Sequence, residues 1–86
     1  MYQIKYLSHV VEHDLSKIDP SIRKRIFRAI EKLAGYPDIF GEPLRHDLKG
    51  LYKLRVGDWR VIYEIKHNEL VVLIVKIGHR REVYER

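Results

Sequence analysis

The sequence predicts an α+β fold: an N-terminal strand, a helical hairpin and then a three-stranded antiparallel meander, all in one mostly antiparallel sheet. Residues 51–63 alternate apolar and polar side chains around a Gly-Asp pair, which is typical of a β-hairpin. Residues 70–77 are almost continuously apolar and β-branched, as in a strand buried on both faces. Helical periodicity precedes both stretches, so we expect the helices to cover one face of the sheet.

The chain length and composition indicate one small globular domain spanning residues 1–86. The chain is 45% hydrophobic and 34% charged, which is enough apolar material for a single core. It contains no cysteine, so neither a disulfide nor thiolate chemistry is available. No apolar run approaches the roughly 20 residues that cross a bilayer, and the N-terminus lacks a signal-peptide pattern. We therefore expect a cytoplasmic protein with no membrane partner.

The first elements are predicted from local patterns. Residues 2–7 alternate loosely and contain β-formers, which indicates a strand. Ser8 is a plausible N-cap of a short helix. In that helix Val11, Leu15 and Ile18 would form one apolar stripe.

A second helix is predicted to begin at Asp19 and Pro20, an N-cap followed by proline at the first helical position. Gly35 and Pro37 would end it, and residues 36–50 are expected to form a loop. Packed against the first helix, it would complete the helical hairpin. Its inward-facing residues would be Ile22, Ile26, Ile30 and Leu33.

The meander is expected to comprise strands at 51–56, 59–66 and 70–77, with a turn at 67–68 between the last two. Side chains on a strand alternate between its faces, so Lys53 and Arg55 share one face. The opposite face would carry Tyr52, Leu54 and Val56. Tyr63 is expected to pack in the core because of its place in the alternation.

Positive charge is concentrated in the second half of the chain. The net charge is +5, and from Arg45 onward ten lysines and arginines face six acids, against seven and six before it. This distribution favours a phosphate-rich partner. A helix-borne group of cations is better explained as a solvated surface. That group is Arg23, Lys24, Arg25, Arg28 and Lys32.

Several enzyme classes are disfavoured. Residues 9–13 read His-Val-Val-Glu-His, which fits an inverted zinc-peptidase motif, but no third ligand is evident and the chain is too short for such a domain. The three serines lie near predicted helix starts, where capping explains them, and the acids are scattered among basic residues. There is no glycine-rich phosphate loop. We expect no metal and no cofactor.

A cluster of cations remains as the candidate site. Lys53, Arg55 and Arg60 come from adjacent strands, and the segment after the last strand can bring Arg80, Arg81 and Tyr84 to the same neighbourhood. A lysine among cations loses its proton more easily and can act as a base, whereas arginine holds phosphate charge. Such a set could cleave RNA through attack by the 2′-hydroxyl, and a basic binding face without chemistry is the alternative.

The two stretches that carry this cluster resemble the RelE branch of the RelE/ParE toxin superfamily. They read Leu-Lys-Gly-Leu-Tyr-Lys-Leu-Arg-Val-Gly-Asp-Trp-Arg-Val-Ile-Tyr at 48–63 and Ile-Gly-His-Arg-Arg-Glu-Val-Tyr at 77–84. The resemblance implies a RelE-like, microbial-RNase-like fold and the toxin of a type II toxin–antitoxin system. Such a toxin is a metal-independent endoribonuclease that cuts mRNA in the ribosomal A site. Its implied partners are mRNA, the ribosome and a RelB-like antitoxin that silences it, with operator DNA bound only through the antitoxin complex.

The same resemblance implies roles for individual residues. Lys53 matches a lysine for base chemistry or charge stabilisation, and Arg55 stands where the family has a second lysine. Arg60 matches the phosphate-binding arginine, Arg80 the general acid or leaving-group stabiliser, and Tyr84 a tyrosine that stacks on the substrate base or helps activate the 2′-hydroxyl. Adjoining residues are expected to contact RNA, namely Arg45, Lys49, Tyr52, His79 and Arg81.

Two other functions fit the same fold. A ParE-like toxin would poison DNA gyrase, although that branch generally lacks the full set of lysine, arginine and tyrosine found here. A decayed toxin would survive as a non-catalytic module that binds antitoxin or nucleic acid.

Overall fold

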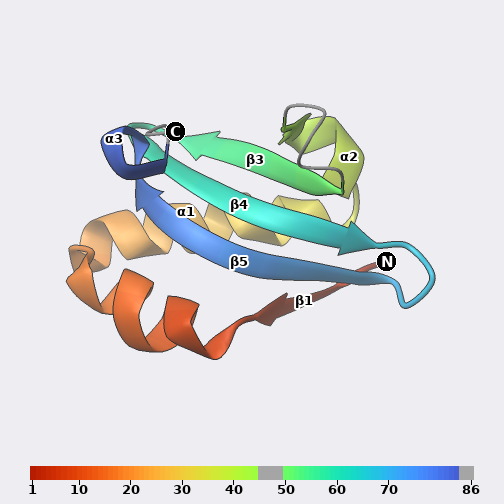
Figure 1. Ribbon diagram of the computed structural model, residues 1–86, viewed down its shortest axis with the longest axis horizontal. Helices are drawn as coiled ribbons and strands as arrows, with labels where there is room; N and C mark the ends of the chain where they lie inside the picture. The colour runs from red at the N-terminus through yellow and green to blue at the C-terminus, as the bar shows by residue number, and fades with distance from the viewer. Residues whose placement is uncertain (45–49, 84–86) are drawn as a thin grey trace.

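Five strands form one sheet in the order β1-β5-β4-β3-β2, with the long helix α1 along one face (Figure 1). The structure is a computed structural model that describes residues 1–44 and 50–83. The pairing of β1 with β5 is parallel and the other three pairings are antiparallel, which confirms the predicted fold class and meander. The strands are β1 (Gln3–Tyr6), β2 (Glu42–Pro43), β3 (Leu51–Val56), β4 (Trp59–Lys66) and β5 (Val71–His79). The α-helices are α1 (Pro20–Glu31), α2 (Pro37–Phe40) and α3 (Arg80–Val83).

The hairpin of β3 and β4 has the predicted boundaries. Its turn is the pair Gly57 and Asp58, and Gly57 has a φ of 61°. This left-handed conformation costs glycine little, and it lets a two-residue loop follow the twist of the strands. Val56 lies opposite Trp59 and Leu54 opposite Val61, so the apolar side chains of both strands share one face.

The short helix before α1 differs from the prediction in which valine it buries. Val10 is fully buried and Val11 is 52% exposed, so the predicted stripe beginning at Val11 is wrong. The segment is π-helix over Val10–Asp14 and 3₁₀-helix over Leu15–Lys17. The amide of Leu15 donates to the carbonyl of Val10, and this wider turn brings residues five apart onto one face. Leu15 and Ile18 are buried as predicted.

Helix α1 begins with the predicted cap. The Asp19 carboxylate accepts hydrogen bonds from the amide and the hydroxyl of Ser21, at 3.1 and 2.5 Å. These bonds lower the pKa of the Asp19 carboxyl, so the cap stabilises the helix while it is ionised and is lost as pH falls through that pKa. Nη1 of Arg23 donates to the carbonyls of Leu15 and Ile18. These bonds stabilise the turn of the chain between the 3₁₀ segment and α1.

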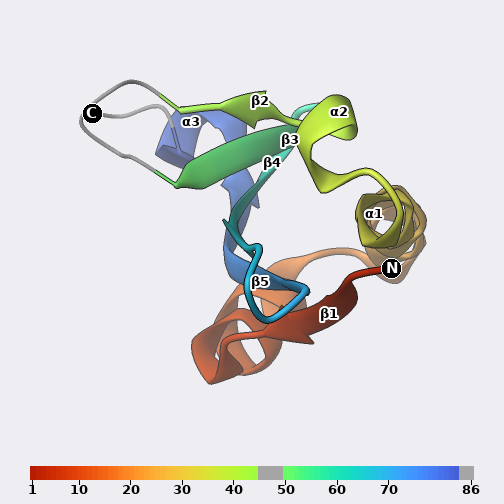
Figure 2. The same ribbon diagram turned by 90° about the vertical axis from the view of Figure 1, so that its right-hand side faces the viewer.

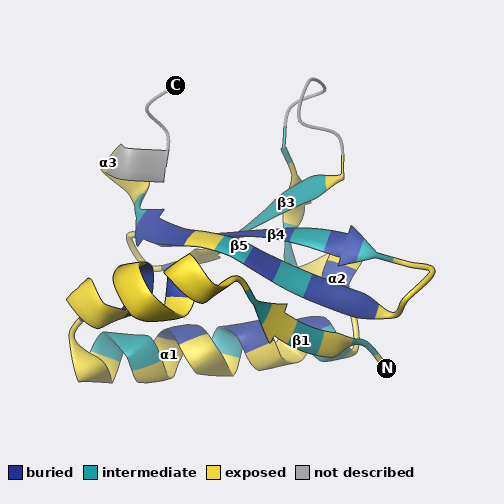
Figure 3. Cartoon of the chain, turned by 60° about the horizontal axis from the view of Figure 1, so that its bottom comes forward, coloured by how far each residue is buried: buried dark blue, intermediate teal, exposed yellow. Residues whose placement is uncertain are grey.

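The α1 face predicted to point inward does so. Ile26, Ile30 and Leu33 are buried, the last in a 3₁₀ turn at Lys32–Ala34, whereas Ile22 at the first turn is half-buried. Figure 3 shows the buried positions of α1 on the side that faces the sheet.

The stretch predicted as a loop after α1 is partly ordered as regular elements. Pro37 begins the single turn of α2, and β2 adds a short edge strand to β3. Periodicity could not reveal elements of four and two residues, because each spans only about one repeat of its pattern and a periodic signal needs several. The predicted loop residues 45–49 lie outside the described part of the chain.

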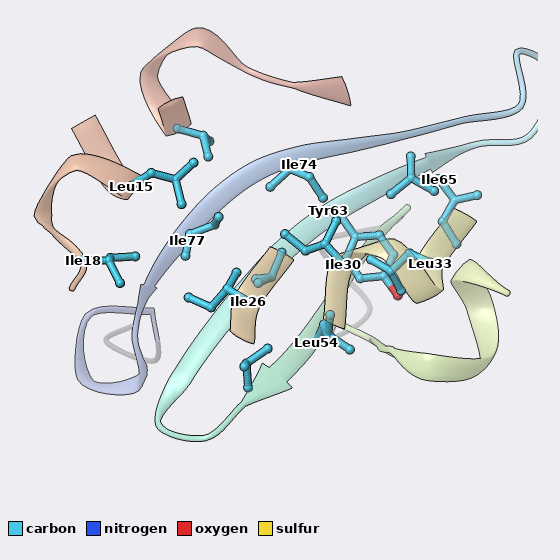
Figure 4. Packing of buried hydrophobic residues seen from close by; sticks show 14 residues of the cluster. Leu15, Ile18, Ile26, Ile30, Leu33, Leu54, Tyr63, Ile65, Ile74 and Ile77 are labelled. Carbon is cyan, nitrogen blue, oxygen red and sulfur yellow. The ribbon is translucent and has the colours of Figure 1, made fainter. Parts of the chain in front are cut away.

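The core lies between the sheet and the helices, and Tyr63 is at its centre (Figure 4). The tyrosine ring is fully buried and stacks on Tyr52, with ring centroids 5.6 Å apart. Its hydroxyl donates to the carbonyl of Pro37, and burial raises the pKa of that hydroxyl well above its usual value. The hydroxyl therefore remains a donor throughout the physiological pH range and links β4 to α2.

No helix among residues 1–44 and 50–83 is long and apolar enough to cross a membrane.

Strand β5 contains an extra residue relative to β4. Ile62 lies opposite Lys76 and Tyr63 opposite Ile74, so Val75 has no partner on β4. Such a β-bulge reverses the alternation of side chains beyond it. Ile77 is consequently buried in the core, and Lys76 is exposed on the other face.

The buried carboxylate of Asp14 supports β5 just after this bulge. Its Oδ2 accepts a hydrogen bond of 3.0 Å from the amide of Ile77. The neighbouring strand β1 pairs with β5 only as far as Ile74, so its backbone cannot reach this amide. Asp14 thus continues the edge of the sheet with a side-chain acceptor, as buried amides require.

Gly41→Ala is expected to destabilise the protein by about 1–3 kcal/mol, because a Cβ there would lie 1.9 Å from the Tyr63 hydroxyl oxygen. The backbone at Gly41 is extended, so the clash alone accounts for the cost. Gly35→Ala is the matched control, since a Cβ at Gly35 meets nothing within 4 Å. Urea unfolding of both variants measures the difference, and equal stabilities would contradict this account of the packing.

Asp14→Ala is expected to cost about 1–3 kcal/mol, because it leaves the buried Ile77 amide without an acceptor. Glu12→Ala removes an exposed acid from the same helical segment and should change stability by less than about 0.5 kcal/mol. Hydrogen exchange of the Ile77 amide should become faster in the first variant only. Unchanged protection in Asp14→Ala would show that the carboxylate does not hold this edge.

Candidate nucleic-acid interface

The face of the sheet that α1 does not cover, here called the open face, carries most of the cationic side chains of the strands. Strand register assigns each side chain to a face, because residues directly opposite one another point the same way. Figure 2 shows α1 on one side of the sheet and α3 on the other. The open face carries the cations Lys5, Lys53, Arg55, Arg60, Lys66 and Lys76 and the acids Glu42 and Glu64. A phosphate chain approaching this face would meet a net positive surface.

Three predicted site residues come together on the hairpin. Lys53 lies opposite Ile62, and Arg55 lies directly opposite Arg60. The predicted separation of Lys53 and Arg55 from the apolar face of β3 is confirmed, since Leu54 and Val56 are buried in the core. Like charges directly opposite one another destabilise a sheet. An anion bound between them would relieve this repulsion.

Arg60 differs from its neighbours in being 5% exposed. Its Nη1 donates to the carbonyls of Gly57 and Trp59, both at 2.9 Å. The guanidinium therefore braces the β-turn from within the strand that follows it. These bonds also direct its charge toward backbone oxygens, which reduces its repulsion with exposed Arg55.

Helix α3 brings Arg80 and Arg81 to the same end of the sheet. The amide of Arg80 donates to the carbonyl of Asp58 at 2.8 Å, so α3 starts beside the hairpin turn (Figure 1). Both arginines are exposed. The prediction that this segment returns to the hairpin is confirmed for these two residues, and Tyr84 lies outside the described part of the chain.

Two of the residues expected to contact RNA lie on the opposite side of the sheet. Tyr52 stacks on the buried Tyr63, and His79 lies opposite Trp59 with the rings edge to face at 5.5 Å. Both side chains therefore pack on the helix-covered face, away from Lys53. Adjacent residues of a strand point to opposite faces, so Tyr52 points away from the face that carries Lys53. The pairing of His79 with Trp59 puts His79 on the same side as Tyr52. Arg45 and Lys49 lie outside the described residues.

Two polar residues on the open face were not anticipated from the sequence. Glu42 of β2 lies opposite Lys53 and sets a carboxylate beside the predicted catalytic lysine. Lys53 on β3 and Lys76 on β5 both lie opposite Ile62 of β4, one on each side of that strand. Lys76 was detectable as the one lysine in an otherwise apolar run. Nothing in the sequence pattern indicated which face it would take.

The His-x-x-Glu-His stretch forms no metal site among the described residues, where no group of three or more histidine, cysteine or acidic side chains could hold an ion. Nδ1 of His13 lies 3.3 Å from Oδ1 of Asp14, whose other oxygen accepts from the Ile77 amide. The hydroxyls of Ser16 and Ser21 bond to nearby backbone and cap atoms. These residues support the helices.

The site thus consists of cations contributed by β3, β4, β5 and α3, together with one carboxylate from β2. Arginine forks can hold the two free oxygens of a phosphodiester, and a lysine can accept or donate a proton or stabilise charge. This composition suits phosphate binding and phosphoryl transfer without a metal ion.

Comparisons with known proteins identify similar chains. A family model described as the ParE toxin of the type II toxin–antitoxin system parDE matches residues 6–84. The toxin RelG of Mycobacterium tuberculosis is 30% identical over 86 residues, covering 99% of this chain and 98% of that protein.

Similar folds are found among solved structures. The toxin–antitoxin complex RelBE2 from Mycobacterium tuberculosis contains a chain with a TM-score of 0.82 and 30% identity, covering 92% of this chain and 98% of that one. The isolated RelE toxin of Escherichia coli has a TM-score of 0.81 at 20% identity, covering 98% of this chain and 92% of that one. The second similarity supports the fold alone.

Arg60→Ala is expected to destabilise the protein by about 1–3 kcal/mol, because two turn carbonyls lose their donor. Arg55→Ala removes the same charge from the exposed partner directly opposite and should change stability little or slightly increase it. Thermal unfolding of the two variants separates these effects. Equal losses would mean that charge, and not the bracing of the turn, accounts for the effect of Arg60.

Proposed function

Because this chain belongs to the RelE/ParE superfamily of type II toxin–antitoxin toxins, we propose that it is an endoribonuclease that cuts mRNA in the ribosomal A site. The observation that carries the proposal is the gathering of Lys53, Arg55 and Arg80 around the β3–β4 hairpin. A surface that only attracts nucleic acid needs spread charge, whereas cleavage needs several cations around one phosphate.

The proposed reaction is an internal transfer of the phosphodiester. The 2′-oxygen attacks the neighbouring phosphorus while a base takes its proton. The bond from phosphorus to the 5′-oxygen then breaks, and the 5′-oxygen leaves with a proton. The products are a 2′,3′-cyclic phosphate and a 5′-hydroxyl end, so no water or cofactor is consumed.

We assign the steps to residues by their positions. Lys53 takes up the 2′-proton or stabilises the charge that develops on the phosphate, with Glu42 as the nearest carboxylate in register. Arg55 holds the phosphate oxygens, and Arg60 adds positive charge while it braces the turn. Arg80 stabilises the leaving oxygen from the start of α3. Tyr84 is proposed, by resemblance alone, to stack on the base or help activate the 2′-hydroxyl.

A RelB-like antitoxin is the proposed protein partner. Support comes from similar chains whose structures were solved in complex with an antitoxin. They include RelBE2 of Mycobacterium tuberculosis and the archaeal RelE–RelB complex of Pyrococcus horikoshii. With a net charge of +5, this chain would suit an acidic partner segment. Operator DNA is expected to be bound only through that complex.

A ParE-like poison of DNA gyrase is the second candidate, because the matching family model is the one described as ParE. It predicts blocked replication and DNA damage with intact transcripts. A harmless protein on expression without antitoxin would instead indicate a binding module without chemistry.

Induced expression without antitoxin is expected to arrest growth and produce transcript ends at fixed positions within codons. Lys53→Ala and Arg80→Ala should each lower the cleavage rate on programmed ribosomes by about a hundredfold or more, since each removes a charge that acts in the transition state. Arg28→Ala removes an exposed cation from α1 and should cleave normally. Growth arrest with intact transcripts, or full activity in Lys53→Ala, would contradict the nuclease assignment.

A further inference from the structure

Lys76 is the only exposed residue of β5, and it lies beyond Ile74, where the pairing of β5 with β1 ends. Its neighbours along the strand are apolar, and buried Ile77 follows it. It makes no ion pair with any of the described residues, whereas Lys66 on the same face lies 3.6 Å from Glu64. An isolated cation within a mostly apolar strand requires a physical explanation.

The β-bulge determines where Lys76 points. Val72 and Ile74 face the core, so simple alternation would direct Lys76 into the core as well. The unpaired Val75 shifts the register by one residue and places Lys76 on the open face. Bulges that redirect a side chain in this way are common beside functional sites.

The redirected lysine joins the row that contains Lys53. Ile62 lies opposite Lys53 on one side and opposite Lys76 on the other, so the two lysines flank a single strand. Two strand spacings separate their Cα atoms by about 10 Å. Ile62 is 6% exposed and carries no charge, so the residue directly opposite Lys76 offers it no carboxylate.

We propose that Lys76 binds a second backbone phosphate of the RNA, adjacent to the phosphate held at Lys53 and Arg55. The inference rests on the proposed nuclease function and adds a binding position to it. A contact to a phosphate that does not react stabilises the bound substrate and the transition state equally. It therefore strengthens substrate binding and leaves the limiting rate unchanged.

The side-chain chemistry agrees with this role. A lysine ammonium is a compact charge on a flexible stem, which suits contact with a phosphate whose position varies along a single strand. Strand β4 separates Lys76 from Lys53, which we assign to the reacting phosphate, so the two lysines are placed to contact neighbouring phosphates. Lys76 is thus a substrate-binding residue and not a participant in proton transfer.

The first test measures RNA affinity as a function of salt. Fluorescence anisotropy with a labelled single-stranded RNA, 2′-O-methylated so that it cannot be cut, reports the dissociation constant. Lys76→Gln should weaken binding roughly tenfold at low salt and reduce the slope of log K against log salt by about 0.7, the value for one phosphate contact on a single strand. Lys76→Arg should restore both quantities.

Lys5→Gln is the matched control, because it removes the same charge from the same face on the edge strand β1. It should leave the slope unchanged. If Lys76→Gln behaves like Lys5→Gln while Lys53→Gln weakens binding, the inference is overturned and the nuclease proposal stands. If the unaltered protein neither binds this RNA nor cleaves transcripts, the nuclease proposal fails, and the inference fails with it.

Cleavage on programmed ribosomes separates binding from chemistry. Lys76→Gln should raise the toxin concentration for half-maximal cleavage roughly tenfold, with a limiting rate within about twofold of the unaltered protein. Lys53→Ala should instead lower the limiting rate. A reduced limiting rate in Lys76→Gln, with normal half-saturation and normal thermal stability, would show that Lys76 acts in the transition state and would overturn the proposed role.

Discussion

The arrangement of this molecule depends on one residue that has no partner, Val75 in β5. Without it, the strand would bury Lys76 and expose Ile77, at a cost of an unpaired charge in the core and a lost apolar contact. With it, the core beneath β5 is continuous and the open face gains a cation. The local irregularity is therefore a condition for both the stability of the fold and the composition of the proposed RNA surface.

The bulge requires support on its outer side, and the helices supply it. Strand β1 ends at Tyr6, and Asp14 then provides the acceptor that the Ile77 amide needs. The wide π-turn that carries Asp14 also buries Val10. One short segment thus seals the edge of β5 and fills the core beneath it.

The open face shows how a small domain can hold many like charges. Arg60 is almost buried and bonds to turn carbonyls, whereas Arg55, directly opposite, is exposed. Beneath them, Tyr63 joins β4 to α2 through the Pro37 carbonyl. The cations therefore stand on a sheet whose other face is densely packed. Preorganised cations of this kind can stabilise transition-state charge without rearranging, because the packing has already offset the cost of their repulsion.

The sequence by itself determined β1, α1, the three strands of the meander and the register of the hairpin. The alternation at 51–63 puts the side chains of Lys53 and Arg55 on one face of the sheet and those of Leu54 and Val56 on the other. The Gly-Asp turn sets the pairing of the two strands, because a two-residue turn leaves only one register. The apolar run at 70–77 carries no alternation, so only the pairing of β5 with β4 decided the face of Lys76. Likewise, the sequence pattern did not show that Val10 is buried and Val11 exposed, because this depends on the π-helical turn. Bulges and π-turns arise from contacts between segments, and a linear pattern does not record them.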